Sequence, residues 1–139
     1  MTDYVDAARP TGAERTVERI AVSILIVDDH EMFRTDARAL LEAAGYRVIG
    51  EAGDAADAVT ETRRLAPDVV LLDVQLPDGD GFAVAAELAT QAGAPRIVLI
   101  SSREAIDYGS RLRDTVAVGF IHKPDLSRAL LEELVGAPG

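Results

Sequence analysis

The side chains that could do chemistry in this chain are acids placed directly after apolar stretches. Asp28 and Asp29 follow the run 24–27, and Asp73 follows the run 69–72. Apolar runs of this length indicate buried strands. A single Asp in such a position is ordinarily a helix cap or a turn residue. A chemical role therefore depends on what the other strand ends bring to the same place.

Two further apolar runs are followed by a hydroxyl pair and an amine. Ser101 and Ser102 come after the run 97–100, and Lys123 stands shortly after the run 116–121. Lys123 is the single lysine among the 14 basic residues, and the rest are arginines. In open parallel sheets, ligands bind beyond the carboxyl ends of the strands. We therefore expect acids, a hydroxyl and an ammonium group to lie together at one sheet edge.

The elements that would position these groups alternate between strand and helix. The expected strands cover residues 24–27, 46–51, 69–73, 97–100 and 116–121. The expected helices end before Gly45, run from the Asp54 cap to about Leu65, cover about 82–91 and 104–113, and begin at the Asp125 cap. Alternation with almost entirely apolar strands indicates an α/β fold, in which helices cover both faces of a parallel sheet. The helix at 104–113 is the weakest, because it contains Gly109 and few apolar positions.

The length and composition indicate one domain. We expect a flexible N-terminal extension at 1–20, a folded domain at 21–136 and a short tail at 137–139. The net charge of −10 disfavours binding to nucleic acid or to an anionic membrane surface, and it favours a protein or a small ligand as partner. The absence of cysteine excludes a disulfide framework, a thiolate metal site and a cysteine nucleophile. With no signal peptide or membrane span in the sequence, a cytoplasmic location is expected.

Carboxylates that converge at one edge repel each other and call for a cation. A hard divalent ion suits oxygen ligands, and Mg²⁺ is the first choice. Because Mg²⁺ commonly works with phosphates, a phosphoryl group is a natural ligand, with Lys123 and the Ser101 hydroxyl on its other side. Asp73, the middle carboxylate, could then attack phosphorus and form an aspartyl phosphate.

These residues resemble the motif set of the response regulator receiver domains, the CheY-like family. The resemblance covers about residues 24–135. The matching positions are the acidic pair Asp28 and Asp29, the phosphoacceptor Asp73, the hydroxyl residue Ser101, and Lys123 before Pro124. It implies a flavodoxin-like (βα)5 fold with a doubly wound five-stranded parallel sheet in the order 2-1-3-4-5.

The resemblance also implies a set of Mg²⁺ ligands. By that resemblance, Asp29 and Asp73 bind the ion directly and the backbone carbonyl of Gln75 supplies a third oxygen. Asp28 acts mainly through a bound water.

The resemblance assigns roles to the residues around the phosphoryl group as well. Ser101 and Phe120 are the switch residues, and the Lys123–Pro124 bond is expected to be cis. Apart from the resemblance, Ser101 and Ser102 could simply form a turn, but the Ser102 backbone N–H can donate to a phosphoryl oxygen in the same geometry. A core role for Phe120 is nearly as well supported by the sequence.

The implied function is acceptance of a phosphoryl group on Asp73 from a histidine kinase or a phosphotransfer protein. Phosphorylation would switch a protein-binding face made by the helix at 104–113, the following strand and the last helix, in a domain that assists only its own phosphorylation and dephosphorylation. The downstream partner and homodimer formation stay open. Because no output domain follows, a stand-alone receiver or an isolated receiver fragment is expected.

Other interpretations remain for the same residues. A receiver used as a constitutive protein-binding module would not depend on phosphorylation. A hydrolase is disfavoured, because Gln75 stands where a second acid would be needed. The acidic stretch 78–81 imitates part of a calcium loop, but Leu76 occupies the first ligand position, so we expect a structural loop. His30 and His122 are expected to be surface or packing residues.

Overall fold

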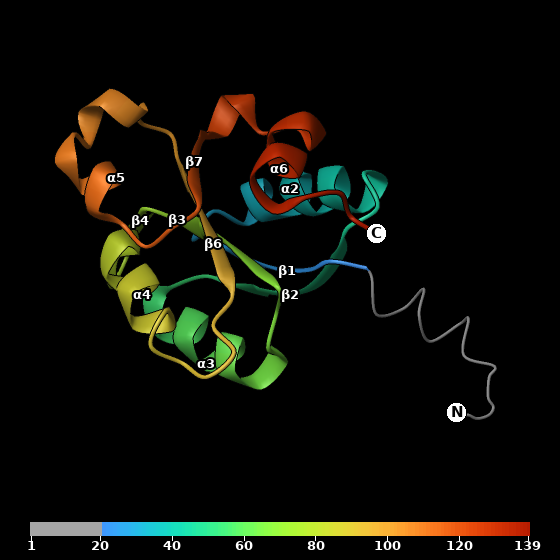
Figure 1. The fold of residues 1–139 in the computed structure, drawn as a ribbon, viewed down its shortest axis with the longest axis horizontal. Helices are drawn as coiled ribbons and strands as arrows, with labels where there is room; N and C mark the ends of the chain where they lie inside the picture. Colours follow the sequence, from blue (N-terminus) through green and yellow to red (C-terminus); the bar gives the residue numbers. More distant parts are fainter. Residues whose placement is uncertain (1–20) are drawn as a thin grey trace.

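The structure, a computed structural model, describes residues 21–139, so the extension predicted at 1–20 lies outside the described residues. Five parallel strands form one sheet in the order β2-β1-β3-β6-β7 (Figure 1). The strands are β1 (Ser23–Val27), β2 (Arg47–Ala52), β3 (Val69–Asp73), β6 (Arg96–Ser101) and β7 (Gly119–His122). Counted along the chain, this order is 2-1-3-4-5, so the predicted flavodoxin-like α/β fold is confirmed.

Helices cover both faces of the sheet, and each face has its own core (Figure 1). On one face lie α2 (Glu31–Ala43) and α6 (Arg128–Val135). On the other lie α3 (Ala55–Leu65), α4 (Gly81–Leu88) and α5 (Ser110–Asp114). Neighbouring side chains of β1 and β3 alternate between the two cores, which is why these strands are apolar throughout.

The helix starts follow from side-chain caps. Asp54 accepts a hydrogen bond from Asp57 N, as the predicted cap requires. The last helix begins later than predicted, because the Ser127 side chain caps it by accepting from Leu130 N. Asp125 instead lies in the 3₁₀ turn η2 (Lys123–Asp125), so its assignment as the cap was wrong. The expected cis bond before Pro124 was also wrong: Pro124 lies in this turn, and no peptide bond among residues 21–139 is cis.

A small antiparallel hairpin follows β3. Its strands are β4 (Gln75–Leu76) and β5 (Gly79–Asp80), in a stretch predicted only to be rich in turns. At its end, a Cβ on Gly81 would lie 2.5 Å from the Asp73 carbonyl oxygen, so only glycine lets α4 begin this close to β3. The Asp78 carboxylate accepts hydrogen bonds from the backbone of α3, which gives this loop a structural role.

The connecting segment, residues 104–118, differs most from the sequence prediction. The expected helix is broken into η1 (Ala105–Asp107) and α5, with Gly109 at a φ of +55° between them. Neither piece contains a buried residue, and Ile106 is 85% exposed. The strand expected from 116 begins only at Gly119. With so few apolar side chains to bury, the segment cannot hold one continuous helix against the sheet.

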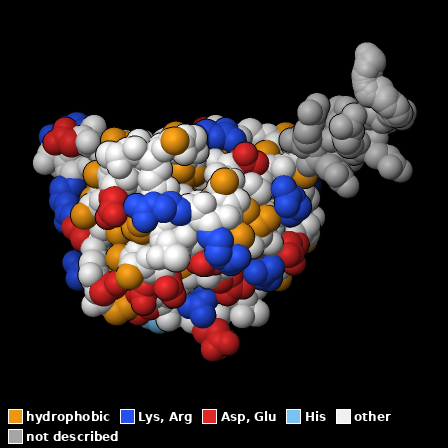
Figure 2. Space-filling model, turned by 90° about the horizontal axis from the view of Figure 1, so that it is seen from below, with side chains coloured by type: hydrophobic (Ala, Val, Ile, Leu, Met, Phe, Trp, Pro, Cys, Tyr) orange, Lys and Arg blue, Asp and Glu red, His pale blue; other side chains and the backbone are white. Residues whose placement is uncertain are grey.

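The C-terminal end folds back onto the domain. Pro138 is buried, and its carbonyl accepts a hydrogen bond from Val22 N at 2.8 Å. Figure 2 shows a surface on which acidic and basic side chains are interspersed. Within the described part of the chain, no helix has the length and apolar character to span a membrane.

Candidate functional site

Acidic side chains from two adjacent strands meet at the carboxyl edge of the sheet. β1 and β3 pair in parallel with Val27 opposite Leu72, which places Asp28 beside Asp73. Asp28 and Asp73 are buried, whereas the Asp29 side chain is 36% exposed. One carboxylate oxygen of each acid and one ring nitrogen of His30 lie within 4.8 Å of one another. The three acids predicted from the sequence are therefore brought together.

The single lysine of the chain reaches the same place from the opposite side of β3. Lys123 Nζ lies 2.6 Å from Asp28 Oδ2 and 3.4 Å from Asp73 Oδ2. The ammonium also lies 4.6 Å from the centre of the Phe33 ring, within the range of a cation–π contact. No local sequence pattern predicts this contact between Phe33 and Lys123.

The electrostatics of the cluster leave negative charge uncompensated. Burial, and then the charge of Asp28, raise the pKa of Asp73 to about 6, although Lys123 acts in the opposite direction. Despite its short distance from Lys123, the buried Asp28 Oδ2 accepts no directed hydrogen bond within residues 21–139. Three acids face one ammonium group. A hard divalent cation such as Mg²⁺ fits this set of oxygen donors.

The residues flanking Asp73 are positioned by the neighbouring hairpin and strand. Gln75 N donates to Asp73 Oδ1 at 3.2 Å, so the backbone of Gln75, whose carbonyl is a predicted Mg²⁺ ligand, lies next to the Asp73 carboxylate. Ser102 is exposed, and its carbonyl oxygen lies 3.0 Å from His122 Nε2. His122 is thus a half-exposed residue whose ring contacts the turn after β6, in agreement with its expected role as a surface or packing residue.

Ser101 ends β6, and its side chain is fully buried. Its hydroxyl accepts a hydrogen bond from Arg103 N at 3.0 Å and lies 2.6 Å from the Tyr108 hydroxyl. Neither of these partners belongs to the acidic cluster. Tyr108 was missed in the sequence, where the only available signal was an aromatic residue within a poorly predicted helix.

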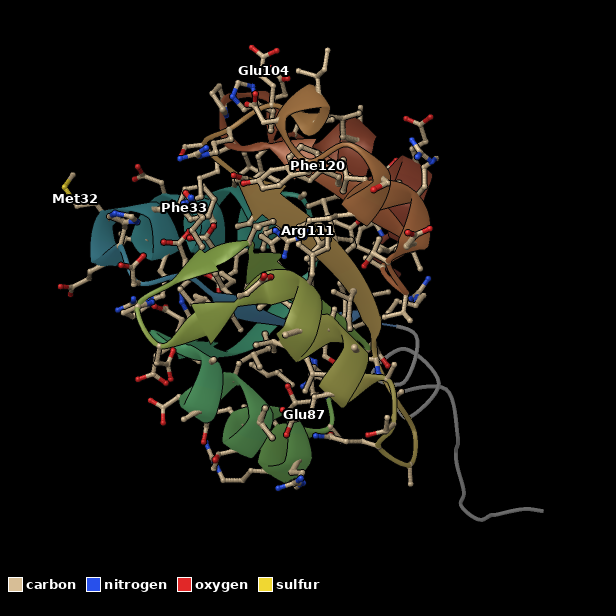
Figure 3. All side chains as sticks on the ribbon, turned by 90° about the vertical axis from the view of Figure 1, so that its left-hand side faces the viewer. Met32, Phe33, Glu87, Glu104, Arg111 and Phe120 are labelled. Carbon is tan, nitrogen blue, oxygen red and sulfur yellow. The ribbon has the colours of Figure 1, made fainter. Side chains whose placement is uncertain are left out.

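Phe120 is half-buried on β7 and packs against the core that α3, α4 and α5 cover. Its ring lies 5.7 Å from the Tyr108 ring in an edge-on arrangement. In Figure 3, Phe120 and Arg111 lie on the side of the molecule formed by the connecting segment, whereas Met32 projects outward from α2. The position suits both a core role and a switch role, so its role as a switch stays a prediction.

His30 makes closer contact with the acids than predicted. Its Nδ1 lies 3.1 Å from Asp28 Oδ1 and 3.1 Å from Asp29 Oδ1, although the side chain is 70% exposed. Its backbone N–H also donates to Asp28 Oδ1 at 2.8 Å. His30 is therefore a surface residue, as predicted, that in addition borders the acidic cluster.

The comparisons with known proteins agree with this geometry. The family model described as the response regulator receiver domain matches residues 24–135. The chain belongs to this family. This receiver is 35% identical to the signal receiver domain of the putative response regulator NarL from Mycobacterium tuberculosis, with a TM-score of 0.70 over 84% of this chain and 98% of that one. The chemotaxis response regulator CheY4 of Vibrio cholerae shares the fold at 23% identity, with a TM-score of 0.70 over 81% of this chain and 94% of that one.

One curated relative is longer than this chain and is matched over only part of its length. The transcriptional regulatory protein PdtaR of Mycobacterium tuberculosis is 36% identical over 116 residues, which are 82% of this chain and 54% of that protein. The chain thus spans about half the length of that curated relative. This chain is a receiver domain of two-component response regulators, and its acidic cluster is consistent with phosphorylation and Mg²⁺ binding.

Proposed function

We propose that this receiver accepts a phosphoryl group on Asp73 from a phosphohistidine, in a reaction that requires Mg²⁺. The donor would be a histidine kinase or a histidine phosphotransfer protein. The observation that carries the proposal is the meeting of Asp28, Asp73 and Lys123 at one sheet edge, with Lys123 Nζ 2.6 and 3.4 Å from the two carboxylates. One ammonium among several acids suits a site that takes up both a divalent cation and a phosphoryl group.

The transfer exchanges one bond to phosphorus for another. An oxygen of the ionised Asp73 carboxylate forms the new P–O bond, the P–N bond to the donor imidazole breaks, and the imidazole leaves with the bonding electron pair. Lys123 Nζ lies close enough to the Asp73 carboxylate to contact the phosphoryl group during the transfer and to offset the charge on its oxygens. When bound by Asp29, Asp73 and the Gln75 carbonyl, with Asp28 acting through water, Mg²⁺ supplies further charge neutralisation.

Around the phosphoryl group, the chain provides hydrogen-bond donors at the end of β6. We assign the Ser101 hydroxyl and the Ser102 backbone N–H to the phosphoryl oxygens. A change at Ser101 would be passed to Phe120 and to the face formed by the connecting segment, β7 and α6, which would alter binding of a downstream protein. The domain would act in the cytoplasm, and its only chemistry would be its own phosphorylation and dephosphorylation.

The test is phosphorylation by small donors, measured by intact mass. Incubation with Mg²⁺ and either acetyl phosphate or phosphoramidate, which carries a P–N bond, is expected to add one phosphoryl group. The addition should be lost in Asp73→Asn and after chelation of the metal. Asp36→Asn is the matched control, since it makes the same chemical change at an exposed position on α2.

An unmodified wild-type chain that also fails to bind Mg²⁺ would overturn the proposal. A downstream partner that binds wild type and Asp73→Asn equally well would indicate a constitutive protein-binding module instead.

A further inference from the structure

The buried hydroxyl of Ser101 is already engaged by partners outside the acidic cluster. A serine hydroxyl has one hydrogen to donate and two lone pairs. Arg103 N donates to Ser101 Oγ at 3.0 Å, and the Tyr108 hydroxyl lies 2.6 Å away. Both partners follow β6 in the chain. A phosphoryl oxygen carries no hydrogen, so Ser101 can contact it only by donating its own hydrogen.

The second partner, Tyr108, connects this hydroxyl to two other elements. Its ring packs edge-on against Phe82 of α4 and Phe120 of β7, with centroid distances of 5.5 and 5.7 Å. These three residues form an aromatic cluster. The guanidinium carbon of Arg111 in α5 lies 4.4 Å from the centre of the Phe82 ring, and Arg111 pairs with Asp80, the N-cap of α4. A movement of Tyr108 would therefore disturb both the start of α4 and the position of α5.

The connecting segment that carries Tyr108 is held weakly by other contacts. No residue of η1 or α5 is buried, and Gly109 breaks the segment directly after Tyr108. Tyr108 and Leu112 are the half-buried side chains by which these turns pack on the core. Segments with few buried contacts open at a low free-energy cost. The loss of one strong hydrogen bond can therefore change the position of the connecting segment.

We propose that Tyr108 is a positioning residue that holds the Ser101 hydroxyl away from Asp73, and that phosphorylation of Asp73 releases it. The inference rests on the proposed function and adds its regulation. In the resting receiver, Ser101 bonds Tyr108. When Asp73 carries a phosphoryl group, the Ser101 side chain turns toward that group and donates to it, the Tyr108 hydroxyl loses its partner, and the aromatic cluster and the connecting segment move together. Phe120 has no hydroxyl and cannot hold Ser101 in this way, so the direct link to Ser101 is Tyr108.

The test measures affinity of the full chain for the phosphoryl mimic beryllium trifluoride in the presence of Mg²⁺. Tyr108→Phe keeps the ring and removes the competing hydroxyl, so the mimic should bind about two- to tenfold more tightly. In a Ser101→Ala background, the same substitution should have no effect, because the hydroxyl it competes for is gone. Tyr46→Phe is the matched control: Tyr46 is buried and its hydroxyl donates to Gly136 O at 2.8 Å, and its loss should leave the affinity unchanged.

Tyrosine fluorescence is a second measurement, and it would not respond to the mimic if Tyr108 had only a structural role. The chain has three tyrosines and no tryptophan, so tyrosine fluorescence is not masked. The mimic should change the emission of wild type and of Tyr46→Phe, and this change should vanish in Tyr108→Phe.

Equal or weaker binding of the mimic by Tyr108→Phe would overturn the inference. Failure of the proposed function looks different, because wild type itself would then neither bind the mimic nor be phosphorylated by small donors.

Discussion

The carboxyl edge of the sheet and the connecting segment 104–118 lie side by side in the fold but are built differently. At the edge, Asp28 and Ser101 are 0% exposed and Asp73 is 3% exposed. In the connecting segment, Ile106 is 85% exposed and neither η1 nor α5 contains a buried residue. Asp28, Asp73 and Ser101 of the candidate phosphorylation site are thus buried, whereas the candidate signalling element is exposed.

The difference has a physical basis. β1, β3 and β6 are interior strands, each paired on both sides, so the backbone that carries Asp73 and Ser101 is held by hydrogen bonds in two directions. The connecting segment is held mainly by the side chains of Tyr108, Leu112 and Arg111. Precise chemistry requires the first arrangement, and a reversible response requires the second.

The largest effect is expected at Lys123. Lys123→Met removes the ammonium between two buried carboxylates, which should lower the free energy of unfolding without Mg²⁺ by about 3–5 kcal/mol. It should also abolish phosphorylation by small donors. Chemical denaturation and intact mass are the measurements. If Lys123→Met were phosphorylated as fast as wild type, the ammonium would have no part in the transfer.

A smaller effect of opposite sign is expected for Asp73→Asn in the absence of metal. Burial and the charge of Asp28 raise the pKa of Asp73 to about 6 in the fold. The folded state therefore binds a proton more tightly than the unfolded state, and the stability due to Asp73 is lost as pH rises through about 4 to 6. Asp73→Asn removes the ionisable carboxyl, so this pH-dependent loss of stability should disappear. The free energy of unfolding should then rise by about 1–3 kcal/mol at pH 7–8.

Thermal unfolding at pH 4 and pH 8, with a metal chelator present, measures this difference. The gain should appear at pH 8 and be nearly absent at pH 4, and Asp36→Asn should show no such pH dependence. A gain of equal size at both values would contradict the assigned pKa.

The smallest effect is expected in the connecting segment. Ile106→Ala removes a side chain that is 85% exposed, so the free energy of unfolding should change by less than about 0.5 kcal/mol. Phosphorylation by small donors should be unaffected. Urea denaturation checks the first expectation. A loss as large as that of a core residue would mean that the segment is packed far more tightly than its exposure indicates.

The same contrast explains which features could be predicted from the sequence. Asp28, Asp73, Ser101 and Lys123 each end or closely follow an apolar run, and the parallel topology brings such ends together without further information. The Tyr108 contact with Ser101 joins an apolar strand to a segment with no clear periodicity, so no local pattern could predict it. The roles of the site residues as Mg²⁺ ligands and phosphoryl contacts stay predictions.

The boundaries were wrong where two local signals competed. Both Asp125 and Ser127 can cap a helix, but the turn formed by Lys123 and Pro124 takes up Asp125 and leaves Ser127 as the cap. This choice depends on where the turn packs, which the sequence alone does not specify.

The most direct measurement is to locate the phosphoryl group. After phosphorylation with phosphoramidate and Mg²⁺, borohydride reduction converts an aspartyl phosphate into homoserine, which peptide mass spectrometry can place in the chain. We predict homoserine at Asp73, at the end of β3, and at no other acid. Homoserine at Asp28 or Asp29, or none at all in a protein that binds Mg²⁺, would contradict the assignment of Asp73 as the phosphoacceptor.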